Sequence, residues 1–177
     1  MSSELPDRVD PFRLCDGAQS FQGRLKLADM PRLSEALVSQ DGEVSYRIDC
    51  DRDERRRARL TGSADAELAV VCQRCMGPMR LPVHVEFQLA VVTGQDEAAL
   101  LPEEYDPLLL EEDTLSLASV IEDELILALP VAPLHPVEEC TEDPADWSLT
   151  DIEPDTVLQR ENPFAVLAGI KGPKKDD

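Results

Sequence analysis

Apolar residues occupy every second position between residues 80 and 92, and this alternation constrains the fold more than any other feature of the sequence. A period of two is typical of a strand that has one face in a core and the other in water. A short apolar run at 69–71 precedes it, and the turn-forming residues 76–78 separate the two runs. The pattern therefore predicts a β-hairpin, and the alternating residues are Leu81, Val83, Val85, Phe87, Leu89 and Val91.

Two cysteines, Cys72 and Cys75, stand at the predicted tip of this hairpin, where two thiols can point at a common centre. After a proline-rich stretch that must run extended, His135 and Cys140 supply two further ligand types. Three thiolates and one imidazole would supply the four ligands that a closed tetrahedral zinc site requires. We therefore hypothesise a zinc site built from these four residues, although nothing in the sequence itself brings its two halves together.

Other interpretations of these cysteines remain open. Cys72 and Cys75 could be unligated buried thiols or the remnant of a metal site, with His135 an ordinary residue. A thioredoxin-like redox pair is less favoured, because that chemistry places the first cysteine at the start of a helix, whereas a strand follows here. The five cysteines do not predict a disulfide framework, and Cys15 and Cys50 are expected to be small core residues.

The remaining periodicity predicts an α+β fold. We expect an antiparallel sheet of about five to seven strands, open or barrel-like, with a few packed helices. A helix of about ten residues should follow Asp29, which is the expected N-cap, and a longer one should run from a Ser116 cap to Pro130. The segment 93–102 should be a loop or short helix. Strands are predicted as two short pieces within 12–27, the second at 21–27, and at 43–50, 55–62 and 80–92.

Leu117, Ile121 and Leu125 should face the core from the long helix, with the acidic residues 122–124 mostly on its other face. The apolar stripe of a short C-terminal helix, which includes Phe164, should also be buried.

A chain of 177 residues fits one domain, so we expect residues 1–177 to form a single unit. Within it, 138–161 should be an acidic loop or disordered segment, and 171–177 a flexible tail. The start of the chain lacks the pattern of a secretory signal, and the longest apolar stretch is too short to cross a bilayer. We therefore expect a cytoplasmic protein without a membrane partner.

The net charge of −20 is unevenly distributed, because residues 96–161 contain 20 acidic residues and one basic residue. Arginines concentrate in one short stretch, where they could form a solvated rim or a surface that contacts RNA phosphates. The candidate RNA-binding residues, which include two arginines near the hairpin tip, are Arg52, Arg55, Arg56, Arg57, Arg59, Arg74 and Arg80.

The sequence contains no constellation typical of an enzyme. It has no glycine-rich phosphate loop and no nucleophile elbow, and it has only two histidines. We therefore expect neither catalysis nor a small-molecule substrate.

Several blocks together resemble the bacterial YceD family, also called DUF177. The resemblance implies a non-enzymatic role in the accumulation of 23S ribosomal RNA, through the synthesis, processing or stability of the large ribosomal subunit. In many bacteria the family is encoded beside a zinc-ribbon protein of that subunit, and plant members are similar organellar factors. The matching blocks are 72–75, 101–107, 120–131 continuing through His135 and Cys140, and 162–168.

Two functional hypotheses follow. In the first, the protein binds 23S rRNA or a precursor of the large subunit directly through its arginines. In the second, it is an acidic chaperone or adaptor for a basic large-subunit ribosomal protein. Both kinds of complex are electrostatic, so salt dependence alone does not separate them.

Overall fold

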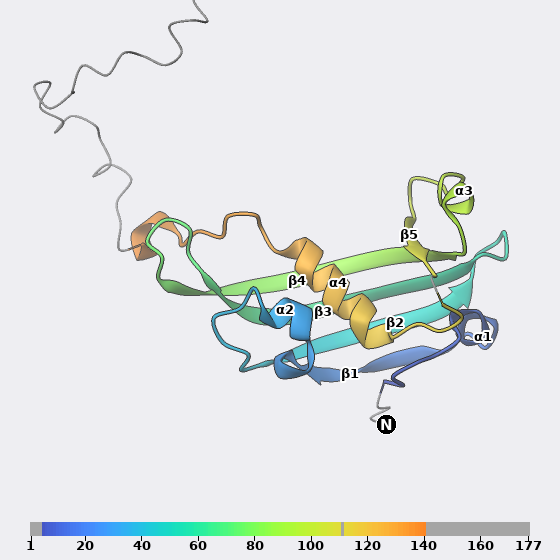
Figure 1. Ribbon diagram of the computed structural model, residues 1–177, viewed down its shortest axis with the longest axis horizontal. Coiled ribbons are helices and arrows are strands. Elements are labelled where there is room, and N and C mark those ends of the chain that lie inside the picture. The colour runs from blue at the N-terminus through green and yellow to red at the C-terminus, as the bar shows by residue number, and fades with distance from the viewer. Residues whose placement is uncertain (1–4, 111, 141–177) are drawn as a thin grey trace, which may run out of the picture. The chain divides into compact units, whose positions relative to one another are not determined.

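A curved sheet of five strands, ordered β1-β2-β3-β4-β5, forms the framework of the protein in the computed structural model, which describes residues 5–110 and 112–140. The first four strands are antiparallel neighbours in chain order (Figure 1). Together with the helices, this sheet confirms the predicted α+β class. The strands are β1 Ser20–Lys26, β2 Glu43–Arg52, β3 Ala58–Val71, β4 Pro78–Val92 and β5 Asp106–Leu109.

The fifth strand corrects the sequence analysis in two respects. β5 pairs parallel to β4 rather than antiparallel, because the connection through α3 (Gln95–Ala98) returns the chain to the level of Leu89 before β5 begins. β1 and β5 form the two opposite edges, so the sheet is open and the barrel-like alternative is wrong.

The predicted hairpin of β3 and β4 is confirmed and is the longest feature of the sheet, with strands of 14 and 15 residues. The more buried side chains alternate along β3 and along β4 as far as Leu89, as the sequence pattern indicated, whereas residues 89–92 are all buried. Gly62 is paired with Phe87, and a Cβ atom at Gly62 would lie 2.4 Å from the Phe87 ring. Only glycine therefore allows Phe87 to cross its neighbouring strand at this point.

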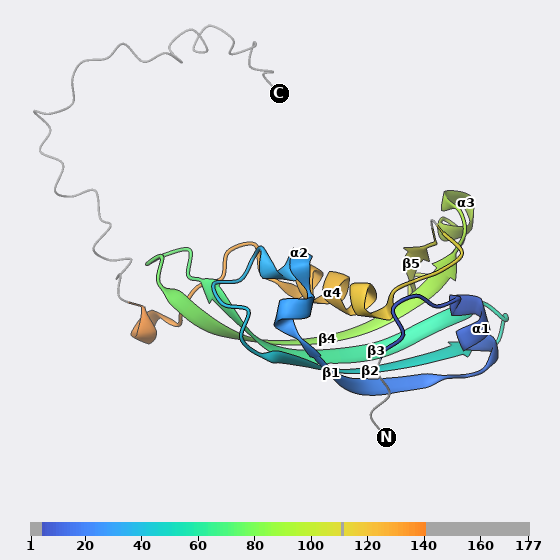
Figure 2. The same ribbon diagram turned by 60° about the horizontal axis from the view of Figure 1, so that its bottom comes forward.

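Three helices cover one face of the sheet. Figure 2 shows α2 and α4 on the inwardly curved face, with α1 on the same side near the β2–β3 turn. Two short 3₁₀ helices complete the described elements. The helices are α1 Pro11–Asp16, η1 Leu27–Asp29, α2 Pro31–Ser34, α4 Leu117–Ala128 and η2 Val137–Glu139.

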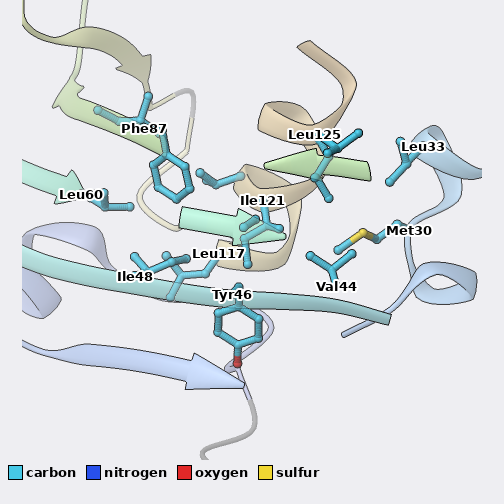
Figure 3. Packing of buried hydrophobic residues seen from close by; sticks show 14 of the residues in the cluster. Met30, Leu33, Val44, Tyr46, Ile48, Leu60, Phe87, Leu117, Ile121 and Leu125 are labelled. Atoms are coloured by element: carbon cyan, nitrogen blue, oxygen red, sulfur yellow. The ribbon is translucent and has the colours of Figure 1, made fainter. Parts of the chain in front are cut away.

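The longest helix, α4, agrees with its prediction. The Ser116 hydroxyl accepts a hydrogen bond from the Ser119 N–H at 3.3 Å and caps the first turn. Leu117, Ile121 and Leu125 are fully buried and point toward residues of β2 such as Val44 (Figure 3). Cys15 and Cys50 are also buried in the core, as expected.

Two local predictions were wrong, and the expectation that residues 122–124 lie mostly on the other face of α4 holds for Asp123 and Glu124 but not for Glu122. α1 is a helix, capped by Asp10, where a short strand was expected. α2 has four residues rather than about ten. Glu122 is buried rather than on the solvent face of α4, because its carboxylate accepts the N–H groups of Arg32 and Leu33 at the start of α2. A tertiary contact thus supplies the cap that we assigned to Asp29.

Some predictions fall on residues outside the described ranges. They concern the acidic segment from residue 141 onward, the burial of Phe164 and the tail 171–177. Within the described ranges, no helix is long and apolar enough to cross a membrane.

Candidate metal centre

The turn between β3 and β4 forms the first half of a candidate metal site. The Cys72 N–H donates to the Gly77 carbonyl at 2.9 Å, and the Met76 N–H donates to the Cys72 carbonyl at 2.9 Å. These bonds close a tight turn, in which Met76 adopts a φ of 58°. Cys72 is buried and Cys75 is half-buried. The turn therefore holds both thiols on a rigid backbone at the end of the long hairpin.

The segment after α4 supplies the second half. Leu129 is extended because Pro130 follows it, and the chain then runs back to the β3–β4 turn (orange in Figure 1). The Gln73 N–H donates to the Pro133 carbonyl at 2.8 Å, which fixes this segment beside the turn. The short helix η2 then brings Cys140 to the same place.

The four predicted ligands converge. One ligand atom from each of Cys72, Cys75, His135 and Cys140 lies within 4.8 Å of all the others. In a tetrahedral site with metal–sulfur bonds near 2.3 Å, ligand atoms are about 3.8 Å apart. The observed spacing is therefore close to that of a metal-bound set, and the cluster could bind a metal ion.

His135 is oriented for coordination through one particular nitrogen. Its Nδ1 atom lies 3.4 Å from the Cys75 sulfur, and its Nε2 atom lies 3.3 Å from the Pro78 carbonyl oxygen. A carbonyl can only accept, so Nε2 carries a hydrogen, and in the neutral form of the ring the lone pair of Nδ1 faces the cysteines. Metal-binding histidines commonly have such a partner on the second nitrogen. Sequence reasoning missed the Pro78 carbonyl, which tertiary structure alone brings into position.

The environment also favours the thiolate form of Cys72. Burial raises the pKa of Cys72, but N–H groups of Cys75, His135 and Arg74 point at its sulfur and lower the pKa to about 5. The hydrogen bond with Cys75 in turn raises the pKa of His135. Metals bind cysteine as the thiolate, so Cys72 is prepared for coordination.

The thioredoxin-like alternative finds no support in this geometry. That chemistry needs the first cysteine at a helix N-terminus, whereas Cys72 follows β3 and the turn leads directly into β4.

The arginine-rich stretch forms the turn between β2 and β3, and Asp53 organises it. The Asp53 carboxylate accepts from the Arg57 backbone and Nε at 2.8 and 2.7 Å and from the Arg55 N–H at 2.9 Å. Burial raises the pKa of Asp53, but the bonds from Arg57 and Arg55 outweigh it and lower the pKa. Tyr105, which sequence reasoning missed, donates to Asp53 at 3.4 Å and lies under the Arg57 guanidinium, 4.9 Å from its ring centre.

Most of the candidate RNA-binding arginines are paired with carboxylates. Among the described residues, only Arg55 and Arg56 are exposed with no ion pair or hydrogen bond from the guanidinium. Arg74 has one buried guanidinium nitrogen without a hydrogen-bond partner. The ion pairs are Arg52 with Asp16 at 2.9 Å, Arg57 with Asp53 at 2.7 Å, Arg59 with Asp51 at 2.6 Å and Arg80 with Glu67 at 2.5 Å.

Arg55 and Arg56 lie at one end of β3, and the cluster of Cys72, Cys75, His135 and Cys140 lies at the other end. The strand has 14 residues, so the path along it from one end to the other is about 43 Å at the usual rise of a strand. The structure thus divides the predicted site residues into two separate regions.

Comparison with known proteins relates the chain to one family. The family model described as large ribosomal RNA subunit accumulation protein YceD matches residues 60–171. A protein of that name from Haemophilus influenzae is 31% identical over 169 residues, which cover 95% of this chain and 97% of that protein. No solved structure matches. The family match includes all four residues of the metal cluster and begins after the arginine-rich turn.

Proposed function

Because this chain belongs to the YceD family, we propose that it acts in the accumulation of large-subunit ribosomal RNA. One observation carries the proposal: the relative from Haemophilus influenzae aligns over almost its whole length, so the similarity covers an entire protein. Specifically, the protein is a factor for synthesis, processing or stability of 23S rRNA and for assembly of the large subunit. This role places it in the cytoplasm with the precursor particles.

We propose that this role depends on binding rather than catalysis. Of the two histidines, His135 belongs to the metal cluster. His84 lies on the exposed face of the sheet and contacts the Asp65 carboxylate at 2.7 Å. Among residues 5–110 and 112–140, neither histidine lies beside a serine or cysteine in the geometry of a nucleophile with its base, apart from the cysteines of the cluster itself.

We further propose that the cluster holds zinc in a structural role. Three thiolates with one imidazole form a soft ligand set of the kind that selects zinc. Four protein ligands leave no position for a water molecule or a substrate, which distinguishes structural from catalytic sites. In this role Cys72, Cys75, His135 and Cys140 fasten the segment after α4 to the β3–β4 turn.

Binding to a basic large-subunit ribosomal protein is a second candidate function, and the ion pairs of the arginines favour it. Arg57, Arg59 and Arg80 already contact carboxylates, so an RNA phosphate would have to displace Asp53, Asp51 and Glu67. Direct RNA binding then depends mainly on Arg55 and Arg56. An acidic chaperone or adaptor needs no such rearrangement.

The general proposal is tested by deleting the gene and measuring the ratio of 23S to 16S rRNA and the sedimentation profile of ribosomal particles. We expect less 23S rRNA and fewer complete large subunits, both restored by the wild-type gene. An unchanged ratio in the deletion strain contradicts the proposal. Affinity purification with and without nuclease then separates the two binding modes, because only a direct protein partner survives digestion of the RNA.

A further inference from the structure

A groove between β5 and α4 is the feature that the proposed function leaves unexplained. It has a volume of about 350 Å³. Buried Leu89 and Val120 form its floor, half-buried Leu108 forms one side, and Leu127 stands at its rim with 78% of its surface exposed. A large aliphatic side chain so exposed beside an apolar floor is typical of a surface that a partner covers.

The groove follows the flank of α4 next to the face that packs on the core, and Val120 of the groove belongs to the buried core. Leu117, Ile121 and Leu125 point into the core, whereas Val120, Glu124 and Leu127 follow one another at helical spacing along the groove. This flank therefore has a carboxylate between buried Val120 and exposed Leu127, and within the described ranges no packing covers Leu127.

The charge of the groove specifies what could bind there. Asp106, Asp123 and Glu124 surround the apolar floor. Arg32 pairs with Asp123, but within the described ranges neither Asp106 nor Glu124 has an ion pair. Burial and the neighbouring carboxylates Asp106 and Asp123 raise the pKa of Glu124. A cationic group placed between these carboxylates would relieve their repulsion, whereas a nucleic-acid phosphate would be repelled.

The edge of the sheet beside the groove is poorly suited to strand addition. β5 has only four residues, and Pro107 within it has no N–H to donate to an added strand. A partner at this place is therefore held by side chains in the groove rather than by a main-chain ladder.

We infer that this groove binds a segment of a basic protein in which an aliphatic side chain lies next to lysine or arginine. The aliphatic group contacts Leu108 and Leu127, and the cationic group pairs with Asp106 and Glu124. The inference rests on the proposed function only for the class of partner, namely the basic proteins of the large ribosomal subunit.

The test uses overlapping peptides of fifteen residues from the large-subunit ribosomal proteins of the same cell, with affinities measured by fluorescence anisotropy on the full-length chain. We expect the tightest peptides to combine an aliphatic residue with neighbouring lysine or arginine. Leu127→Ser should weaken them about tenfold, and Glu124→Gln about threefold with a weaker salt dependence. The matched controls are Leu100→Ser, at a leucine that is 83% exposed, and Glu103→Gln. Both residues lie outside the groove. The control variants should bind like the wild type.

Several results would overturn the inference. The first is that no peptide of this composition binds, and the second is that groove and control variants bind with equal affinity. The third is that Leu127→Ser loses rRNA binding and keeps peptide binding. The fourth is that the protein sediments as a dimer and Leu127→Ser dissociates it. The first three exclude this partner, and the fourth assigns the groove to a second copy of the chain. The level of 23S rRNA in the deletion strain is independent of these results. A failure of the inferred peptide binding can therefore be distinguished from a failure of the proposed function.

Discussion

The backbone N–H of Leu33 donates a hydrogen bond to the side-chain carboxylate of Glu122, with 3.1 Å between nitrogen and oxygen. The Arg32 N–H donates to the same oxygen at 2.7 Å. A buried residue of α4 thus satisfies the free N–H groups at the start of α2, a task that a local serine or aspartate usually performs. Docking of the two helices is therefore tied to one side chain.

Replacing this carboxylate should destabilise the protein strongly. Glu122→Ala leaves two N–H groups without an acceptor and removes a charged hydrogen bond, so we expect the free energy of unfolding to fall by about 2 to 4 kcal/mol. Urea unfolding monitored by circular dichroism measures this free energy. Asp123→Asn is the matched control, because Asp123 is half exposed beside the same arginine and should cost at most about 1 kcal/mol. Equal losses in the two variants would show that the cap has no special role.

The capping role of Glu122 also shows where sequence analysis reached its limit. Leu117, Ile121 and Leu125 were predicted because helical spacing is a local property of the chain. Glu122 was assigned to the solvent face by the same periodicity, since the N–H groups that it caps are about 90 residues away in sequence. Similarly, β5 is too short for its period to be recognised, and only its pairing with β4 makes it a strand.

The core position Leu125 should tolerate no charge. Leu125 is fully buried against the sheet, so Leu125→Asp places an unpaired carboxylate in the core and should prevent folding. The milder Leu125→Ala should cost about 2 to 5 kcal/mol. Leu127→Ala on the same helix should change the stability by less than about 0.5 kcal/mol, because Leu127 is 78% exposed. Thermal unfolding of the soluble variants measures these changes in stability. A larger loss in Leu127→Ala than in Leu125→Ala would contradict the prediction.

Removal of metal should weaken the fold. If the cluster holds zinc, the purified protein should contain about one equivalent by mass spectrometry, and chelation should lower the melting temperature by about 10 °C or more. Cys75→Ser and His135→Ala should lose the metal, whereas Cys15→Ser, at a buried cysteine outside the cluster, should keep it. Metal-free protein with the same melting temperature as the untreated sample would refute a structural zinc.

The arginine-rich turn should contribute stability that depends on pH. Bonds from Arg57 and Arg55 lower the pKa of Asp53 below its ordinary value of 3.8. A carboxyl group with a lowered folded-state pKa stabilises the protein above the unfolded value, and this contribution disappears as the pH falls through the folded value. Asp53→Asn should therefore be less stable than the wild type at pH 7, and the difference should shrink below about pH 4. A difference that stays constant in acid unfolding curves would contradict this account.

Charge substitutions should separate the two modes of binding. Under direct RNA recognition, the double variant Arg55→Gln, Arg56→Gln should weaken binding to 23S rRNA and flatten the salt slope by about 0.7 to 0.9 for each phosphate that the variant no longer neutralises. Arg80→Gln is the control, because Arg80 is paired with Glu67.

Replacing the carboxylates of residues 138–161 by amides should leave RNA affinity unchanged or raise it, and should weaken a complex with a basic ribosomal protein. If the arginine variant binds rRNA like the wild type while the amide variant loses the protein partner, direct RNA binding through this turn is wrong.

The candidate site was only partly predictable, because the spacing of residues in the sequence reveals local pairs but not contacts made across the fold. The spacing of Cys72 and Cys75 is local and can be read from the chain, and the ligand chemistry of His135 and Cys140 made them the natural complement. The pairing of the arginines was not predicted, although Asp51 and Arg59 are direct partners in the register of β2 and β3. Alignment of the two predicted strands across their turn would have brought these opposite charges together.

The separation of the two halves of the metal cluster along the chain has a consequence during synthesis. Cys75 and His135 are 60 residues apart, which a bacterial ribosome requires on the order of 3 to 12 s to translate. The nascent chain can complete the β3–β4 hairpin in that interval, since hairpins form within about 10 μs. For seconds the emerging protein therefore presents Cys72 and Cys75 on a finished turn while His135 and Cys140 are not yet made, so the cluster closes only after the hairpin has formed.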